Sequence, residues 1–206
     1  MGIGWLAKLI VAAVSAFVAT NIDDIIILTI FYSQVSPTFR SKHIFIGQYL
    51  GFSALILLSL PGFLGGLVIP RTWIGLLGFV PIAIGIHTLI SHQDDENHAQ
   101  NTSPEFRSRS FLSSFFAPQI YHVAAVTFAN GGDNISIYIP LFASSDLVGL
   151  GVILSVFFLL VGLWCYAAHL LTRYQPFARV LTRYGKAFVP YVLIGLGIYI
   201  LIESRT

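Results

Sequence analysis

Long apolar runs fill most of the chain, and short polar segments separate them. A window of about 20 residues, the length of helix that crosses a bilayer, identifies six such runs. They lie near 4–32, 43–69, 72–91, 111–143, 147–172 and 186–203. The pattern predicts an all-α integral membrane protein with six transmembrane helices.

Two of these runs contain polar residues near their middle. The first is interrupted by "TNIDD" at 20–24, and the fourth by "NGGDN" at 130–134. The first run is also too long for one straight helix, because at about 1.5 Å per residue it extends roughly 43 Å across a hydrocarbon core of about 30 Å. We therefore expect helices 1 and 4 to be interrupted near the midplane, aided in helix 4 by the backbone freedom of two glycines.

The two polar clusters occupy equivalent places in an internal repeat. With a shift of 110 residues, Ala19, Asp23, Ile25 and Ile27 coincide with identical residues at 129, 133, 135 and 137. Further on, "FVP" at 79–81 recurs at 188–190, and "GIHTLI" at 85–90 is similar to "GIYILI" at 197–202. Each half holds three helices, and this odd number reverses the second half in the membrane. The sequence thus predicts two inverted three-helix repeats, an architecture of many secondary transporters.

The repeats define the organisation of a single transmembrane domain. Residues 1–91 form the first repeat, 92–110 a polar linker and 111–206 the second repeat. Lys and Arg favour cytoplasmic loops, and an external N-terminus places eight of them inside against three outside. We therefore expect both termini outside, a cytoplasmic linker and a location in the bacterial inner membrane.

Composition supports a membrane protein and argues against other classes. The chain has 206 residues, of which 56% are hydrophobic and 10% charged, and its mean hydropathy is +0.81. Its basic residues are scattered among loops, so nucleic acid is not an expected partner. The single cysteine, Cys165, provides neither a disulfide framework nor a Cys-rich metal site. The bilayer is the expected partner, and a homo-oligomer is left open.

Carboxylates inside apolar runs need compensation for their charge. An ionised, unpaired aspartate near the middle of a membrane helix costs about 2.5–3.5 kcal/mol on insertion scales. No Lys or Arg lies near Asp23, Asp24 or Asp133 in these runs. A bound cation, a proton or a water-filled cavity must therefore compensate for them.

Helix capping is the structural alternative for these residues. Thr20 with Asp23, and Asn130 with Asp133, have the spacing of an N-cap residue and its partner three positions later. We expect these caps to form. They do not explain the remaining polar side chains, nor why the chain breaks inside the membrane.

Carboxylate, carboxamide and carbonyl oxygens are ligands of divalent cations, and a broken helix exposes additional carbonyls. If the repeat brings the two breaks together, six oxygen-bearing side chains form a cation site: Thr20, Asn21, Asp23, Asp24, Asp133 and Asn134. Two or three carboxylates balance the charge of a divalent ion. The ion is the transported substrate, and no cofactor is expected.

Other polar residues in the runs are weaker candidates. His87, His122 and His169 are each more typical of hydrogen bonds between membrane helices than of ligands. Gln48 either reaches the site or joins helices. His92 and His98, next to "DDE" at 94–96, are more typical of a solvated linker than of a metal-collecting patch.

Three segments, "ATNIDDIIIL", "GQYLGF" at 47–52 and "FANGGDNISIYIP", resemble the cadmium resistance transporters (CadD type) of the lysine exporter superfamily. The resemblance implies a divalent metal efflux transporter with Cd²⁺ as its substrate. The family's motif positions fall on Asn21, Asp23, Asp24, Asn130, Asp133 and Asn134.

We expect alternating access, with protons replacing the released metal. Oxygen ligands suit Mn²⁺, Ca²⁺ or Mg²⁺ better than the softer Cd²⁺. A transporter or channel for those ions is therefore the alternative.

An intramembrane aspartyl protease is the one enzymatic alternative, because "GGD" at 131–133 resembles its signature and paired aspartates can activate water. The partner run reads "NIDD" and lacks the tyrosine-aspartate motif of those enzymes. The chain is therefore expected to be a transporter and not an enzyme.

Overall fold

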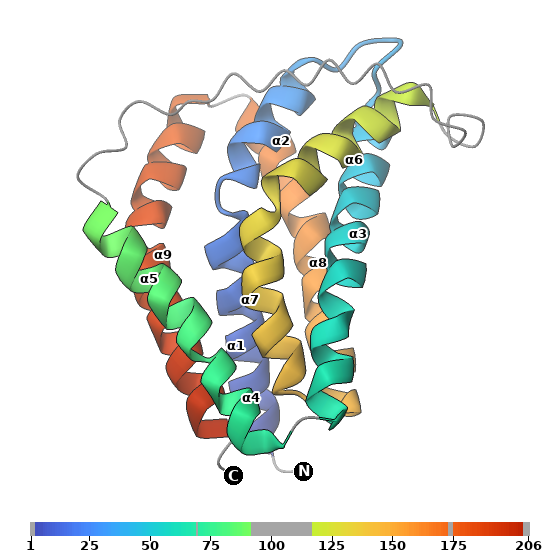
Figure 1. Cartoon of the computed structure of the whole chain (residues 1–206). Coiled ribbons are helices and arrows are strands. Elements are labelled where there is room, and N and C mark those ends of the chain that lie inside the picture. The colour runs from blue at the N-terminus through green and yellow to red at the C-terminus, as the bar shows by residue number, and fades with distance from the viewer. Residues whose placement is uncertain (1–2, 69, 92–116, 173–174, 204–206) are drawn as a thin grey trace.

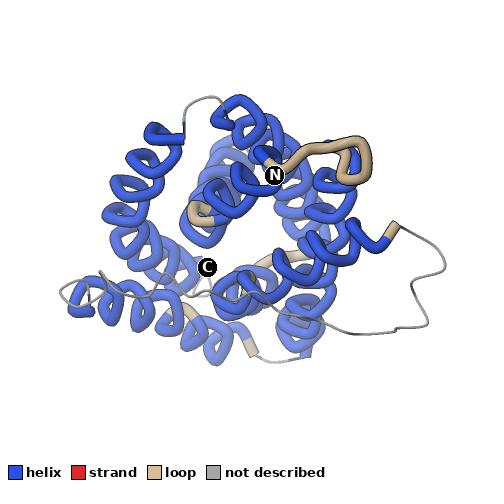
Figure 2. Tube along the Cα trace, turned by 90° about the horizontal axis from the view of Figure 1, so that it is seen from above, coloured by secondary structure: helices blue, strands red, loops and turns tan. Residues whose placement is uncertain are grey.

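The computed structural model describes residues 3–68, 70–91, 117–172 and 175–203, and the regular structure within them is helical (Figure 1). The helices are α1 (Ile3–Asn21), α2 (Asp24–Ser33), α3 (Ser41–Val68), α4 (Arg71–Leu77), α5 (Phe79–Ser91), α6 (Pro118–Asn130), α7 (Gly132–Ala143), α8 (Leu147–Leu171) and α9 (Gln175–Glu203). Figure 2 shows them side by side.

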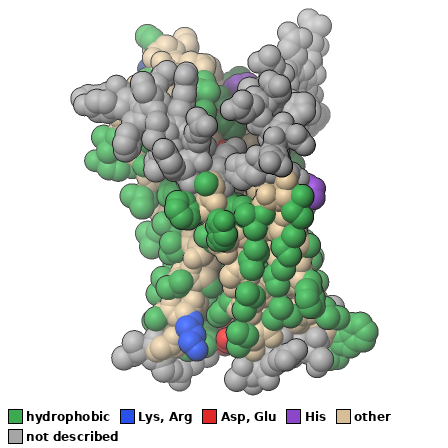
Figure 3. Space-filling model, turned by 90° about the vertical axis from the view of Figure 1, so that its left-hand side faces the viewer, with side chains coloured by type: hydrophobic (Ala, Val, Ile, Leu, Met, Phe, Trp, Pro, Cys, Tyr) green, Lys and Arg blue, Asp and Glu red, His purple; other side chains and the backbone are tan. Residues whose placement is uncertain are grey.

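Four described segments are long and apolar enough to cross a membrane: Gly4–Asn21, Ser41–Val68, Trp73–Ile90 and Leu147–Leu171. Shorter apolar helices cover Asp24–Ser33 and Ala187–Glu203. Hydrophobic side chains cover the middle of the face in Figure 3, whereas acidic and basic side chains lie together at its lower end. This distribution is the one that contact with a bilayer requires.

Both predicted helix breaks are present. The first apolar run consists of α1, which ends at Asn21, and α2, which begins at Asp24. The intervening Asp23 keeps right-handed helical torsions, with φ −80° and ψ −22°, so this break is a small offset between two helices. In the fourth run, α6 and α7 are separated at Gly131.

Gly131 is needed for close packing and not for an unusual backbone conformation. Its φ is −90° and its ψ is 24°, and none of the described glycines has a positive φ. A Cβ atom at Gly131 would collide with the side chain of Leu55 in α3. The expectation that this glycine supplies backbone freedom is therefore wrong, because other residues adopt the same torsions; its missing Cβ leaves room for the Leu55 side chain.

Two helix boundaries differ from the hydropathy pattern. The third run divides into α4 and α5, because the ring of Pro81 in the first turn of α5 would meet the carbonyl of residue 77 in a continuous helix. The last helix begins at Gln175, well before the predicted 186, because polar and basic residues form helix without contributing to an apolar run. The predicted linker at 92–110 lies outside the described residues.

The two broken helices run in opposite directions. In Figure 1, α1 and α2 lead upward from the N-terminus, whereas α6 and α7 lead downward. The unbroken helix α3 packs along α6 and α7, and α8 packs along α1 and α2. The helices α5 and α9 pack on each other, and the beginning of α1 and the end of α9 both lie at the lower end in Figure 1. Each broken helix is therefore flanked by an unbroken helix from the other half of the chain.

Glycines let α3 approach α6 and α7 closely. They are Gly47, Gly51, Gly62 and Gly66, two pairs with the small-xxx-small spacing of packed membrane helices. A Cβ atom at Gly51 would lie 2.8 Å from the Cβ atom of Thr127, and one at Gly62 would lie 2.5 Å from the carbonyl oxygen of Ile139. These contacts hold α3 against both sides of the second break.

A buried aromatic layer fills the bundle below the breaks. It comprises Phe17, Phe52, Tyr138, Phe142 and Phe157, each at most 1% exposed. The rings of Tyr138 and Phe157 are closest, with centroids 4.6 Å apart. Phe17 precedes the first break in α1 and Tyr138 follows the second in α7, so the layer lies between the breaks and the end that carries the termini.

Candidate cation site

A buried hydrogen-bond network lies where the two breaks meet, and Asp24 is at its centre. This residue opens α2 and is 5% exposed. Its Oδ1 accepts a hydrogen bond of 2.5 Å from Nδ2 of Asn130, the last residue of α6. Its Oδ2 accepts a hydrogen bond of 3.3 Å from Nε2 of Gln48 in α3. Three helices thus provide the groups around one carboxylate.

Gln48 is held in turn by α6. Its Oε1 accepts a hydrogen bond of 2.6 Å from the hydroxyl of Thr127, and both side chains are buried. The structure supports both roles open for Gln48, because the side chain reaches Asp24 and its hydrogen bonds also join α3 to α2 and α6. The neighbouring Tyr49 donates to the carbonyl oxygen of Phe158 in α8 and so joins helices.

The end of α1 meets the beginning of α7 through a second set of contacts. Nδ2 of Asn21 donates to the hydroxyl of Tyr138 at 2.9 Å, and its Oδ1 accepts from Nδ2 of Asn134 at 3.3 Å. The hydroxyl of Thr20 lies 3.0 Å from that of Tyr138. The indole of Trp164 in α8 donates to the backbone oxygen of Asn21, which the helix break leaves free. The two broken helices are therefore bridged on both sides.

Asn134 has one polar atom without a partner. The residue is 1% exposed, and its Oδ1 receives no hydrogen bond from the described residues. Leaving such a group unsatisfied costs about 1–3 kcal/mol. A cation or a water molecule at this oxygen would remove the cost.

The other two aspartates lie at the edge of the network. Asp23 is half-buried and Asp133 is exposed, and both are close enough to Asp24 for their charges to interact. Oδ1 of Asp133 accepts a 3.0 Å hydrogen bond from the backbone N–H of Asn134. Within the described part of the chain, no three His, Cys, Asp or Glu side chains are grouped closely enough to hold a metal by themselves. The centre therefore combines one carboxylate with carboxamides and hydroxyls.

The expected N-caps do not form. The second half-helices are preceded by Asp23 and Gly131, and neither makes a side-chain cap hydrogen bond. Thr20 donates instead to the backbone oxygen of Ala16 inside α1, and Asn130 donates to Asp24. The capping prediction is wrong because both residues belong to the last turn of the first half-helices, and their side chains make contacts across the two halves.

The histidines of the spans lie outside the network. The ring of His122 packs edge-on against Phe31, with centroids 5.8 Å apart, and that of His169 packs against Tyr32 at 5.1 Å. His87 is exposed on α5. The candidate patch at His92 and His98 lies outside the described residues.

Sequence reasoning did not identify Thr127 or Tyr138. Each is one helical turn from a motif residue, because Thr127 precedes Asn130 by three positions and Tyr138 follows Asn134 by four. Residues at this spacing share a helix face. Extending each motif by one turn along the same face would have found both.

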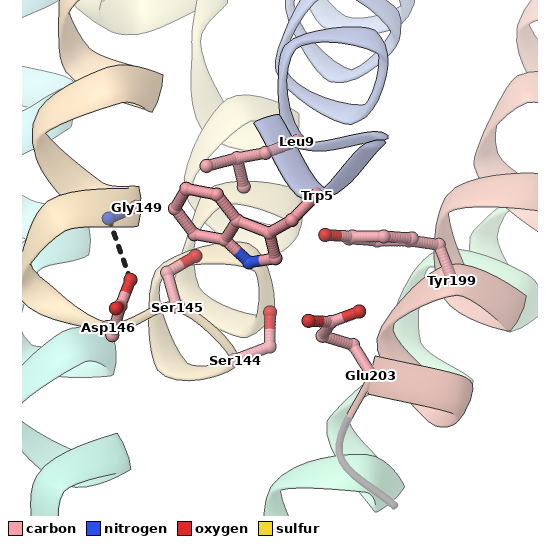
Figure 4. A pocket seen from close by; sticks show the side chains of 8 residues that line it. All are labelled: Trp5, Leu9, Ser144, Ser145, Asp146, Gly149, Tyr199 and Glu203. Atoms are coloured by element: carbon pink, nitrogen blue, oxygen red, sulfur yellow. Dashed lines mark hydrogen bonds between the residues drawn. The ribbon is translucent and has the colours of Figure 1, made fainter. Parts of the chain in front are cut away.

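A separate cavity of about 120 Å³ lies at the lower end of the bundle, between α1, the turn before α8 and α9 (Figure 4). The carboxylates of Asp146 and Glu203 line it, together with Trp5 and Tyr199. Asp146 caps α8 by accepting from the backbone N–H of Gly149 at 2.7 Å. Along α1 and α7, the aromatic layer lies between this cavity and the network.

A buried polar network at two facing breaks, inside a bundle of apolar helices, is typical of a multi-pass membrane transport protein. The sequence model of the cadmium resistance transporter family matches residues 17–206, and the chain belongs to this family. No curated protein and no solved structure shows significant similarity to the chain. The resemblance of the three motif segments is thereby confirmed, and the family favours metal efflux over the proteolytic alternative.

Proposed function

We propose that this chain exports a divalent metal cation by alternating access, and that the cation binds where the two broken helices meet. The observation that carries the proposal is Asp24, a buried carboxylate held between Asn130 of the opposite broken helix and Gln48 of α3. A carboxylate in an apolar bundle is costly unless a cation or a proton compensates for it. This energetic cost supports a site at which a cation and a proton replace each other.

Further oxygen atoms lie at hand for the cation. Oδ1 of Asn134 is buried without a partner, and the carboxamides of Asn21 and Asn130 can each present an oxygen after rotation. The charges of Asp23 and Asp133 lie nearby, and they would attract the cation and balance it. This set of oxygens is typical of hard divalent ions.

The two halves of the chain act, in this proposal, as inverted repeats. The antiparallel broken helices, the reciprocal packing of α3 and α8, and the α5–α9 pair support such a relation. The buried aromatic layer closes the network towards the termini, whereas Asp133 and Gly132 are exposed. We therefore assign this conformation to access from the end of the bundle at which α6 begins, and export requires the aromatic layer to open.

The identity of the transported metal is inferred from the family and from the ligand atoms of the network. The family is described by cadmium resistance, yet the hydrogen-bonded network consists of oxygen and nitrogen groups. Cys165 packs beside Tyr32 and lies near enough to Asp24 to interact with it electrostatically, but its thiol makes no hydrogen bond to the described residues of that network. Oxygen ligands favour Mn²⁺, Ca²⁺ or Mg²⁺ over softer ions. We propose that Cd²⁺ is carried and that Mn²⁺ is also a substrate, with transport of the hard ions alone as the alternative.

Flux measurements on the purified chain in liposomes test this function. We expect saturable transport of Cd²⁺ and Mn²⁺ that an opposing proton gradient accelerates. Flux that does not saturate and ignores pH would indicate a channel. Absence of flux for every divalent ion would contradict the proposal.

A further inference from the structure

Gln48 joins the carboxylate of Asp24 to a residue that can reverse its hydrogen bonding. Nε2 of Gln48 donates to Asp24, and Oε1 accepts from the hydroxyl of Thr127 at 2.6 Å. When Asp24 is ionised, before a cation or a proton compensates for its charge, the carboxylate accepts hydrogen bonds and does not donate them, so it fixes the amide with its nitrogen towards Asp24. Thr127 has no such restriction, because a hydroxyl donates and accepts equally well.

A cation at Oδ2 of Asp24 makes this arrangement unfavourable. The N–H groups of Gln48 would then point at a positive charge, and an amide oxygen at the same place would coordinate it. The terminal torsion of a glutamine side chain is broad, so the amide can exchange its oxygen and nitrogen without moving the rest of the residue. The partner of the exchanged nitrogen would be Thr127.

Thr127 keeps a hydrogen bond to Gln48 in either orientation, as donor in one and as acceptor in the other. When its oxygen accepts from Nε2, its own hydrogen needs another acceptor, and after a change of the side-chain torsion a helical threonine can donate to the backbone carbonyl four residues earlier, here that of Val123. Three other threonines among the described residues make this bond: Thr20 donates to Ala16, Thr29 to Ile25 and Thr88 to Ile84. Both orientations of Gln48 are therefore satisfied at this end.

We propose that Gln48 is a reversible ligand, whose amide donates to Asp24 in the empty site and turns over to coordinate a divalent cation through Oε1, while Nε2 donates to Thr127. This inference rests on the proposed function, because it concerns the same cation at Asp24. It assigns Thr127 as a positioning residue that stabilises both orientations. It also gives the loaded site a neutral oxygen ligand from α3, a helix outside the two motifs.

Titration of the purified full chain with Mn²⁺ by calorimetry tests the role of Thr127. We expect Thr127→Val to weaken Mn²⁺ binding about 10-fold, as loss of a group that orients a ligand does, because the turned amide loses its acceptor. Thr127→Ser keeps the hydroxyl and should bind within about twofold of the original chain. An unchanged affinity in Thr127→Val, with only a lower melting temperature of the metal-free protein, would overturn the inference.

A second variant covers the case in which Thr127→Val does not fold. Gln48→Met places a softer thioether where Oε1 would coordinate, so Mn²⁺ binding should fall about 10-fold, and Cd²⁺ binding should fall less. Equal losses for both ions would contradict a ligand role for Gln48. The proposed function would survive this result if the original chain binds both ions and Asp24→Asn binds neither. No binding by the original chain would overturn both.

Discussion

At the scale of single residues, the two breaks place three aspartates in three environments. Asp24 is buried among amide donors, Asp23 is half-buried and Asp133 is exposed. Charge at the buried position is the most costly and depends most on a compensating ion. Asp24 is therefore the central residue of the proposed cation site.

The first prediction is that Asp24→Asn abolishes Cd²⁺ and Mn²⁺ transport while the protein still folds. Asparagine keeps the shape of the side chain, and Gln48 can turn its oxygen towards the new amide. The loss should appear in liposome flux, beside an unchanged or higher melting temperature. Asp133→Asn is the matched control, and we expect a smaller loss because that carboxylate is exposed. A larger loss of transport in Asp133→Asn would indicate that the cation binds closer to α7.

The second prediction concerns the unpaired oxygen of Asn134. Asn134→Leu removes that atom but also the donor of the 3.3 Å hydrogen bond to Asn21, so one buried oxygen stays unpaired in either protein. The melting temperature of the metal-free protein should therefore change little, whereas its affinity for Mn²⁺ should fall about 10-fold. Calorimetry with an unchanged affinity would show that this oxygen is not a ligand.

Much of the site at this scale could be predicted from the sequence. Asp24 and Asn130 are conspicuous because polar residues are costly in apolar runs. Thr127 and Tyr138 are not, since both residue types are ordinary in membrane helices, and only their spacing of one helical turn from the motifs indicates them. The capping prediction failed because it depends on where a helix ends to within two residues, which hydropathy does not resolve.

At the scale of elements, the site depends on how closely α3 approaches the second broken helix. The glycines of α3 face the backbones of α6 and α7, so the distance between helices is set by the absence of side chains. Gln48 lies between Gly47 and Gly51 on this surface. The position of its amide is therefore coupled to the packing of α3 on α6.

The third prediction is that Gly51→Ala lowers both stability and metal affinity. The new Cβ would lie 2.6 Å from the backbone oxygen of Ala124, and relieving such overpacking costs about 1–3 kcal/mol and moves Thr127 away from Gln48. Gly151→Ala is the control, because nothing lies within 4 Å of its Cβ position. Thermal unfolding should distinguish the two variants. Equal melting temperatures would show that α3 is not closely packed there.

Element boundaries were less predictable than the breaks. Polar clusters in apolar runs located both breaks, because the energetic signal is large and local. The beginning of α9 at Gln175 and the separation of α4 from α5 have no such signal in hydropathy. They depend on helix propensity and on the position of Pro81.

At the scale of the whole molecule, the beginning of α1 and the end of α9 lie at one end of the bundle, whereas α6 begins at the other end (Figure 1). These positions of the helix ends support the expected topology, in which the termini are external and 92–110 is cytoplasmic. Which end of the bundle faces outside is predicted from the distribution of Lys and Arg.

The fourth prediction is that a cysteine at Ser103 is not labelled by an impermeant maleimide in intact cells, whereas one added after Thr206 is. The native Cys165 is 1% exposed and should give little background. In inside-out vesicles, the cysteine at position 103 should be labelled and the one after Thr206 should not. Labelling of position 103 from outside would invert the orientation, and equal labelling of both positions would contradict a common side for the termini.

Whether the cation binds where the two breaks meet is tested most directly by the position of bound Cd²⁺, measured by anomalous diffraction from crystals of the full chain grown with this ion. We expect a peak where the two breaks meet, within about 2.5 Å of a carboxylate oxygen of Asp24, and no such peak in crystals of Asp24→Asn. A peak confined to the lower cavity lined by Asp146 and Glu203, or one that persists unchanged in Asp24→Asn, would contradict it.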